Sequence, residues 1–352
     1  MKINTLHRFN HKWNLFKTRF IYQRIDKNFI PKGSNELRLF VIARNESLRL
    51  PFFLRYYLDN GVDRIFFIDN NSTDNTREIA LNYSNVHVFK IDKSFKNFWN
   101  WIEFFLNKYG KNRWCLVVDV DELFSYPYIE IAPFKNLIEY MELNKYDAIR
   151  SFLLDIYSNK PIINTGYTSN DNPLKYCQYF DAHYYCGEVN LLDKRRWEYF
   201  KTLIYYGGMR ERVFNRIIGT NWNYHLSKIS LFKYSDKVYL TEGMHAINGA
   251  QIADITGIVF HSKYMQDFIE RVMIESEREV HFGNALEYKI YNQACILEKD
   301  INLYYKKSVQ FKNSKQLVKL GMMKSSMNYN NFLAVQKLAI ENHNKEFISI
   351  FT

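Results

Sequence analysis

The sequence predicts an α/β protein with a doubly wound mixed sheet that is flanked by helices and followed by a C-terminal helical extension. Four short apolar runs, typical of strands buried on both faces, recur every 20 to 30 residues. Three stretches with helical features lie between them. Such β-α-β-α-β-α-β alternation is typical of a doubly wound sheet, whose ligands bind at the carboxyl ends of the strands.

The predicted elements follow one another in order along the chain. The predicted strands are 38–43, 64–68, 86–89 and 114–118, and the predicted helices are 51–60, 74–83 and 98–109, the first and last of which end at Gly61 and Gly110. Strand-like runs at 149–154 and 258–260 stand in a less regular region. Residues 262–305 have apolar side chains at helical spacing, which predicts two helices with a break near Gly283.

Composition places the chain among ordinary globular proteins. Its 352 residues are 47% hydrophobic and 24% charged, which excludes disorder, and no apolar run reaches the ~18 residues of a membrane-spanning helix. The four cysteines form no CxxC pair, and no secretory leader opens the chain. A reducing, cytoplasmic location is therefore expected.

Three segments are predicted from loop-forming residues and from the positions of motifs. Residues 1–36 form a basic, aromatic-rich N-terminal extension that ends at Pro31-Lys32-Gly33-Ser34, residues 37–262 form the main α/β domain, and residues 263–352 form a C-terminal helical region.

The net charge of +11 is concentrated at the two ends of the chain. Residues 1–32 carry +7 and residues 301–352 carry +6, so the middle is close to neutral at −2. This distribution argues against a nucleic-acid cleft in the body and favours peripheral contact with an anionic membrane. In 306–324, lysines alternate with apolar residues as in an interfacial amphipathic segment. A general bias toward Lys, Asn and Ile explains the charge equally well.

The strongest chemical signal is Val117-Val118-Asp119-Val120-Asp121-Glu122. Carboxylates at the end of a buried strand repel one another, so a cation is expected there. Asp119 and Asp121 point to the same side of an extended chain, and hard oxygen ligands suit Mg²⁺ or Mn²⁺ held together with a diphosphate. The alternative is a salt-bridged helix cap after the strand.

Polar residues also follow the first two strands. Ala43-Arg44-Asn45-Glu46 closes the first, and Asp69-Asn70-Asn71-Ser72-Thr73-Asp74-Asn75-Thr76 closes the second. Arg44, Glu46, Asp69 and Asn71 are therefore candidate substrate-binding residues, and Asp69 can accept hydrogen bonds from a base N–H or from ribose hydroxyls. Ser72, Thr73 and Asp74 are expected to cap the next helix.

These motifs, in this order, resemble the amino-terminal half of GT-A glycosyltransferases, and more closely the family 2-like bacterial enzymes of surface-polysaccharide (capsule or lipopolysaccharide) synthesis. The resemblance implies that Asp119 and Asp121 hold the metal and diphosphate of a nucleotide-sugar and that Asp69 contacts the nucleotide. It continues through Gly207-Gly208-Met209-Arg210-Glu211-Arg212, Ser227-Lys228 and His261-Ser262-Lys263, and covers about residues 38–264.

The later motifs supply candidates for the remaining roles. Arg210, Arg212, Lys228 and Lys263 are candidate substrate-binding cations, of which the first three are placed to neutralise a departing diphosphate. The resemblance implies a late histidine that completes the metal shell. His261 stands at that place, His245 is its competitor, and a satisfied core histidine is the other alternative.

The catalytic base is the least determined residue. Counting about 90 residues from Asp121, as in the relatives, reaches Glu211 in the Gly-Gly motif; Asp155 and Asp181 are alternatives, and a structural ion pair is equally consistent with Glu211. The usual Glu-Asp pair of the relatives is missing. The arginines on both sides of Glu211 are expected to lower its pKa.

The sequence thus predicts a metal-dependent glycosyltransferase that moves a sugar from a nucleotide-sugar, a UDP-sugar being favoured, to a hydroxyl of a cell-surface glycan or lipid-linked acceptor, with inversion by analogy to the family. No nucleic-acid partner is expected. A sugar nucleotidyltransferase is disfavoured because no Gly-rich phosphate loop follows the first strand. A non-catalytic basic protein bound to membrane or nucleic acid is the alternative from another class, and it would leave the carboxylates without a role.

Overall fold

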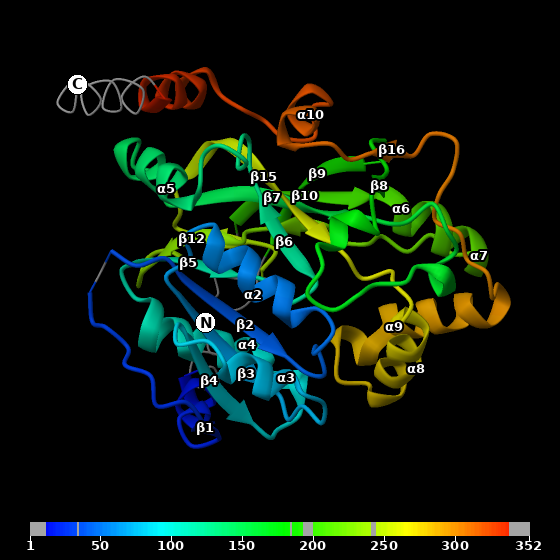
Figure 1. Ribbon diagram of the computed structural model, residues 1–352, viewed down its shortest axis with the longest axis horizontal. Helices are drawn as coiled ribbons and strands as arrows, with labels where there is room; N and C mark the ends of the chain where they lie inside the picture. The colour runs from blue at the N-terminus through cyan, green and yellow to red at the C-terminus, as the bar shows by residue number, and fades with distance from the viewer. Residues whose placement is uncertain (1–11, 34, 184, 193–199, 241–243, 338–352) are drawn as a thin grey trace, which may run out of the picture.

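The computed structural model describes residues 12–33, 35–183, 185–192, 200–240 and 244–337. A large mixed sheet with helices on both faces forms its centre (Figure 1). The strand order along this sheet is β1-β4-β3-β2-β5-β12-β7-β15-β6, and β11 pairs with β7 outside this path. The predicted α/β class with a mixed, helix-flanked sheet is confirmed.

The strands β4, β3, β2 and β5 form a parallel part of the sheet. β2 pairs with both β3 and β5, and β4 pairs with β3. The chain order therefore reverses between β2 and β5, which is the switch point where sheets of this kind bind ligands. The elements are β2 (Arg38–Ala43), α2 (Leu50–Asp59), β3 (Arg64–Asp69), α3 (Thr76–Leu81), β4 (Val86–Ile91), α4 (Phe98–Phe105), the π-helical turn Leu106–Gly110 and β5 (Arg113–Val117).

Side chains on these strands alternate between the two faces of the sheet. On β2, Leu39 and Val41 belong to one buried cluster, whereas Phe40 belongs to the other. The helix α2 packs in the first cluster, and α4 packs in the second through Trp101 and Phe105. Because both faces are covered, the strands are apolar at almost every position, which is why continuous apolar runs predicted them.

The second half of the sheet is mainly antiparallel. β12 is antiparallel to β5 and β7, β15 is parallel to β7, and β6 is antiparallel to β15. The register pairs His261, at the end of β15, with both Asp155 and Glu122, so three polar residues meet at one edge. The elements are β6 (Glu122–Ser125), β7 (Ala148–Asp155), β11 (Ser227–Lys228), β12 (Leu231–Tyr234) and β15 (Ile252–His261).

Smaller elements surround the sheet. They are α5 (Phe134–Leu143), α6 (Gly208–Arg210), the π-helical turn Glu211–Asn215, α7 (Arg216–Ile218), the 3₁₀ turns Phe95–Asn97, Ile162–Asn164 and Pro173–Lys175, and the paired strands β9 (Tyr185–Leu192) with β10 (Phe200–Gly207), β13 (Tyr239–Leu240) with β14 (Ile247–Asn248), and β8 (Tyr179–Phe180) with β16 (Val309–Gln310).

The N-terminal extension takes part in the sheet. Its strand β1 (Tyr22–Arg24) is antiparallel to β4 at one edge. Before it, residues 12–18 form a helix in which Thr18 is buried, while Trp13, Phe16 and Phe20 are 46%, 48% and 69% exposed. The extension is therefore attached to the body and carries a row of exposed rings.

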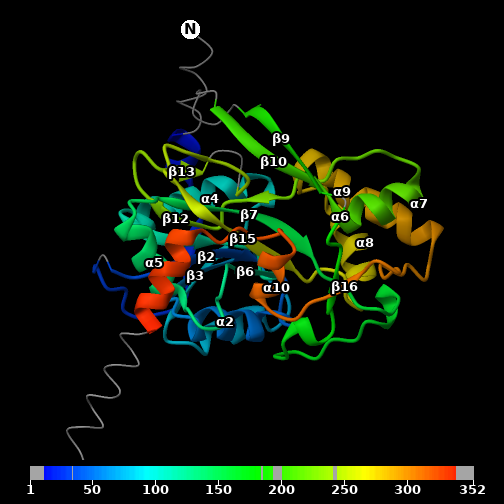
Figure 2. The same ribbon diagram turned by 90° about the horizontal axis from the view of Figure 1, so that it is seen from above.

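The two helices predicted before residue 305 are present as α8 (Phe268–Arg278) and α9 (Phe282–Leu297). Residues 283–285 have positive φ values of 60°, 55° and 62°, so the predicted break near Gly283 is confirmed. Figures 1 and 2 show both helices, with α7, at the end of the sheet to which the arrowhead of β15 points. They therefore stand beside the carboxyl ends of the strands.

The prediction of an amphipathic membrane segment in 306–324 is wrong for three of its apolar side chains, although Leu320 is 43% exposed. Leu317 lies in α10 (Ser314–Lys319) and is fully buried, and Met322 and Met323 are also buried against the core. Side chains already packed inside the protein cannot enter a bilayer. Residues 327–337 form a further helix, and within the described residues no helix is long and apolar enough to cross a membrane.

Candidate active site

The carboxylate motif forms a turn between β5 and β6, not an extended strand. The Glu122 N–H donates to the Asp119 carbonyl at 3.0 Å, which closes the turn. The expectation that Asp119 and Asp121 point to the same side of an extended chain is therefore wrong. The Asp119 side chain is 53% exposed, whereas that of Asp121 is 12% exposed and faces His261. The turn divides the motif into one open carboxylate and one enclosed carboxylate.

His261 joins two carboxylates at the end of β15. Its Nε2 lies 3.3 Å from Asp121 Oδ2, and its Nδ1 lies 2.7 Å from Asp155 Oδ1. Burial alone lowers the pKa of a histidine, yet the two carboxylates outweigh it and raise the pKa of His261. For Asp121, burial opposes ionisation, but His261, Arg271 and Lys263 hold the pKa well below its usual value. Asp121 is thus ionised.

Lys228 supplies a buried positive charge beneath the turn. Its Nζ is 2.7 Å from Glu122 Oε1 and 3.9 Å from Asp119 Oδ2. Glu122 also accepts the Asp119 N–H at 3.1 Å. Loss of hydration in the crowded turn and the Glu122 charge raise the pKa of Asp119, although Lys228 opposes this. Glu122 is therefore held by the protein, whereas Asp119 is open to a ligand.

The residues present fit a divalent cation bound together with a diphosphate. Among the described residues, no three His, Cys, Asp or Glu side chains are already gathered into a metal-binding group. However, the Asp155 carboxylate is hydrogen-bonded to Nδ1 of His261, and the other ring nitrogen, Nε2, is therefore directed at Asp121. Carboxylates orient metal-binding histidines in the same way. Mg²⁺ and Mn²⁺ often take few protein ligands and complete their shells with phosphate oxygens and water. Asp121 and His261 would hold the ion, and Asp119 lies beside them.

Asp69 lies at the end of β3 and is fully buried. Its Oδ2 accepts hydrogen bonds from Nε and Nη2 of Arg77, at 2.9 and 2.6 Å, and its Oδ1 accepts the Ser72 N–H at 3.0 Å. The Arg77 side chain is 23% exposed. Asp69 thus fixes the loop and a partly exposed guanidinium at the carboxyl end of β3.

The loops after β2 and β3 are tied to each other. Asp74 accepts the Ser47 N–H at 3.1 Å and the Thr76 N–H at 3.0 Å, and Ser72 Oγ accepts the Asn45 N–H at 3.1 Å. At the helix N-cap, Asn75 makes no side-chain hydrogen bond. Of the three residues predicted to cap the helix, Asp74 accepts the N–H of Thr76, the first residue of α3, whereas Ser72 and Thr73 link the two loops through Asn45.

The other candidates on these loops differ in exposure. Arg44 is half-buried and donates to the Asn70 carbonyl at 3.2 Å. Asn71 has a φ of 57°, a left-handed backbone conformation that asparagine tolerates well. Glu46 is buried and pairs with Arg271, so the structure places it in an ion-pair cluster.

The helix α8 contributes arginine contacts that the sequence analysis did not find. Arg271 forms two hydrogen bonds with the Glu46 carboxylate, and Arg49 forms two with Asp267 at 2.6 and 2.7 Å. The charge of Arg271 also lowers the pKa of Asp121, which places it near the carboxylate turn. Arg271 is 225 residues from Glu46, so no local pattern could have indicated this pair.

Arg210 and Arg212 face different carboxylates. Arg210 is buried and donates hydrogen bonds from Nε and Nη2 to the Asp155 carboxylate, at 2.8 and 2.9 Å. Its Nη2 also lies 3.1 Å from His261 Nδ1. Arg212 pairs with buried Asp181 at 2.7 Å. Arg210 therefore acts on the site through Asp155 and His261. Both carboxylate oxygens of Asp155 are engaged, and Arg210 and His261 lower its pKa in spite of burial. Asp155 therefore positions His261.

Glu211 stands apart from both arginines. Successive helical side chains point about 100° apart, and each arginine is turned to its own aspartate. Burial therefore dominates, and it raises the pKa of Glu211. The expectation that the arginines lower this pKa is wrong. Glu211 Oε1 accepts the Gly207 N–H at 2.9 Å, at a turn where Gly207 has a φ of 106°.

A second acid that the sequence analysis missed is Glu287 on α9. Its Oε1 lies 2.6 Å from the Tyr291 hydroxyl, 3.3 Å from Arg210 and 3.9 Å from Lys263. Burial opposes its ionisation, but these cations lower the pKa of Glu287. Lys263 lies 4.3 Å from the Tyr288 ring centroid and helps to hold Asp121 ionised. The helix α9 thus adds one acid to the edge of the site.

His245 takes no part in this network. Its Nδ1 lies 2.7 Å from the Ser227 carbonyl, and its ring stacks on His225. Of the two histidines considered from the sequence, the structure brings only His261 to the carboxylate turn.

The mixed, helix-flanked sheet with a carboxylate turn at its edge has the architecture of a GT-A-like fold. Residues 39–200 match the family model described as glycosyl transferase family 2. This segment contains the loops after β2 and β3 and the whole carboxylate turn. His261 and the helices α8 and α9 lie beyond it. No curated protein matches the chain.

Solved structures that resemble the chain do so at low similarity. Glucosyl-3-phosphoglycerate synthase from Mycobacterium tuberculosis, in complex with Mn²⁺, UDP and glucosyl-3-phosphoglycerate, is 14% identical over 36% of this chain and 50% of that one, with a TM-score of 0.24. UDP-glucose pyrophosphorylase from Acinetobacter baumanii is 7% identical over 73% of this chain and 98% of that one, with a TM-score of 0.29. The chain spans about half the length of the first of these.

Proposed function

We propose that this chain transfers a sugar from a nucleotide-sugar, with a UDP-sugar favoured as donor, to a hydroxyl of a bacterial cell-surface glycan such as a capsule or lipopolysaccharide precursor. The family match over residues 39–200 supports the reaction class. The observation that carries the proposal is the buried chain Asp121, His261, Asp155, which ends beside the open carboxylate of Asp119. Such an arrangement suits a divalent cation, which in turn would bind the diphosphate of the donor.

The proposed donor site has two parts, one for the metal and diphosphate and one for the nucleoside. Asp121 and His261 would hold Mn²⁺ or Mg²⁺, whose positive charge stabilises the departing diphosphate when the ion is bound. The charges of Lys263 and Arg271 already act on Asp121, and these two side chains would also pair with phosphate oxygens of the donor. On the other side, Asp69 with Arg77 receives the nucleoside. Asp155 and Arg210 orient His261 and touch no substrate in this proposal.

Glu211 is proposed as the base. Its raised pKa suits a group that must accept a proton near neutral pH. In an inverting transfer it takes the proton of the acceptor hydroxyl while the oxygen attacks the anomeric carbon and the bond to the diphosphate oxygen breaks. The assignment of inversion rests on analogy with the family.

Hydrolysis of nucleotide-sugars in the absence of acceptor tests the proposed reaction. We expect the chain to release a nucleoside diphosphate from one member of a panel of UDP-, GDP- and dTDP-sugars, only with Mn²⁺ or Mg²⁺ present, and to lose this activity with a chelator. Metal-independent binding of polyanions without any hydrolysis would instead support a non-catalytic basic protein.

We also propose that the N-terminal segment contacts an anionic bilayer that presents a lipid-linked acceptor. Trp13, Phe16 and Phe20 are exposed, and Trp13 and Phe16 stack at 5.6 Å beside Lys17. Anionic leaflets attract basic side chains by about 1 kcal/mol each. This combination of exposed rings and bases is typical of segments that lie at a membrane surface.

Sedimentation with phosphatidylglycerol vesicles measures this contact. Full-length protein is expected to bind at low salt and to release at high salt, and Phe16→Ser with Phe20→Ser should reduce the bound fraction at least several-fold. Ile131→Ser, which removes an apolar side chain elsewhere that is 76% exposed, is the control and should bind normally. Equal binding to neutral phosphatidylcholine vesicles would overturn the electrostatic part of the proposal.

A further inference from the structure

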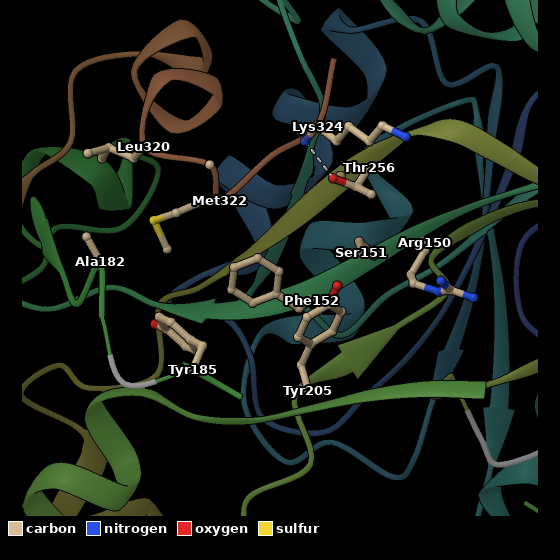
Figure 3. Close-up of a pocket in the computed structure, with 12 residues that line it drawn as sticks. Arg150, Ser151, Phe152, Ala182, Tyr185, Tyr205, Thr256, Leu320, Met322 and Lys324 are labelled. Carbon is tan, nitrogen blue, oxygen red and sulfur yellow. Dashed lines mark hydrogen bonds between the residues drawn. The ribbon is translucent and has the colours of Figure 1, made fainter. Parts of the chain in front are cut away.

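A pocket outside the carboxylate site opens between the sheet and the β9–β10 hairpin. It has a volume of about 320 Å³, within the range of small-molecule sites. Residues of β7, β15, the hairpin and the turn after α10 line it, as Figure 3 shows. None of the residues proposed above for donor binding lines this pocket, so the pocket lies outside the donor site.

Aromatic rings form the centre of the pocket. Phe152 lies 5.3 Å from Tyr185 and 5.7 Å from Tyr205, measured between ring centroids, and the three rings gather in one place (Figure 3). Opposite Tyr205 in the hairpin stands Gly187, where a Cβ would come within 3.3 Å of the Tyr205 ring. Flat aromatic surfaces beside hydroxyl groups suit the C–H faces and hydroxyls of sugars.

Positive charge lies at one end of the same pocket. The Arg150 guanidinium and the Lys324 ammonium extend toward the same side in Figure 3, and the described residues that line the pocket include no Asp or Glu. The backbone N–H of Lys324 donates to Thr256 Oγ1 at 2.8 Å, which fixes this lysine beside β15. Because Arg150 and Lys324 line the pocket and no acidic residue does among the described lining residues, the pocket favours an anionic ligand.

The pocket is connected to the proposed transfer site through two of its own residues. Phe152 precedes Asp155 by three positions on β7, a distance of about 10 Å along a strand. Tyr185 packs on Gly208, where a Cβ would lie only 2.7 Å from the ring, and Gly208 begins the helix that carries Arg210 and Glu211. A chain of two or three sugars could therefore reach from the pocket toward Glu211.

We propose that this pocket binds the acceptor glycan at a sugar unit that carries a carboxylate or a phosphate, with stacking on Tyr185 and Tyr205 and ion pairing to Arg150 and Lys324. The inference rests on the proposed transferase function for its biological meaning. The binding itself requires neither donor nor metal, so it can be measured separately.

Calorimetry without nucleotide or metal tests the proposal with defined probes. A hyaluronan tetrasaccharide supplies a carboxylate-bearing glycan, glucose 6-phosphate supplies a phosphate-bearing sugar, and maltotetraose is the neutral comparison. We expect at least one anionic probe to bind, with an affinity at least about tenfold above that for maltotetraose, the scale of one charge-assisted hydrogen bond. Failure of both anionic probes to bind would overturn the proposal.

Two substitutions separate stacking from charge. Tyr205→Leu keeps apolar packing on Phe152 but removes the ring and hydroxyl, and Arg150→Gln removes one cation. Each should weaken binding of the anionic probe about tenfold, and Arg150→Gln should leave maltotetraose binding unchanged. Tyr304→Leu is the control, because the Tyr304 ring packs on Tyr179 and does not line the pocket. Unchanged affinity in both pocket variants would overturn the site, whereas donor hydrolysis, which these variants should retain, reports separately on the proposed transferase function.

Discussion

Asp121→Ala is expected to abolish metal-dependent binding of UDP, and with it sugar transfer, while the protein remains folded. The side chain is one of the two protein groups proposed to hold the cation, and its low pKa keeps it ionised at neutral pH. The turn itself is held through the backbone, because the Asp121 carbonyl accepts hydrogen bonds from the N–H and the hydroxyl of Ser262, at 2.9 and 3.1 Å. Those bonds persist with any side chain at this position.

Calorimetric titration of UDP with and without Mn²⁺ measures the effect. We expect the wild type to bind more tightly with the metal and the variant to show no difference between the two conditions. Asp236→Ala is the matched control, since Asp236 is 73% exposed and pairs only with Lys111 on the surface in the described structure. Retention of metal-dependent affinity in Asp121→Ala would contradict the assignment, and a thermal melt would separate it from unfolding.

The parallel half of the fold was predictable because its signals are local. Each of the first strands is an apolar run buried on both faces, and glycines end two of the helices between them. The antiparallel half was less regular in sequence, since β6, β11 and β12 span only two to four residues each. Such short strands have too few residues for alternation to show.

The candidate site was predictable where its residues lie at strand ends. The carboxylate motif and His261 both close or follow buried strands, and the structure brings them together. The conformation of the motif was mispredicted because an extended chain was assumed beyond Val117, where a turn begins. Arg271 and Glu287 were missed because they lie on helices beyond the motifs, and their role depends on where α8 and α9 pack.

The charges show why sequence neighbours mislead. Arg210 and Arg212 flank Glu211 in the chain, but their partners are Asp155, 55 residues away, and Asp181, 31 residues away. A helix directs adjacent side chains apart, so proximity in sequence predicted an interaction that is absent in this part of the structure. The raised pKa of Glu211 follows from its burial, and this reverses the argument that had weakened it as a base.

Glu211→Gln is therefore expected to lower kcat by roughly 10²-fold or more, with little change in affinity for the donor. The amide oxygen of glutamine can still accept the Gly207 N–H, so the turn that precedes the helix is retained. In the wild type, the rate should fall as the pH decreases through the raised pKa of Glu211, because the protonated carboxyl cannot take the acceptor proton. This acidic limb should be absent from the small residual activity of the variant.

Glu287→Gln provides the comparison that distinguishes a base from a group that orders cations. Glu287 contacts Arg210 and Lys263 and has a lowered pKa, so its loss should weaken donor binding and change kcat less. Steady-state kinetics with donor affinity measured by calorimetry give both quantities for each variant. If Glu211→Gln keeps kcat within about threefold of the wild type while Glu287→Gln loses two orders of magnitude, the base lies on α9 and not in the Gly-Gly motif, because a loss of that size is the effect expected when the general base is removed.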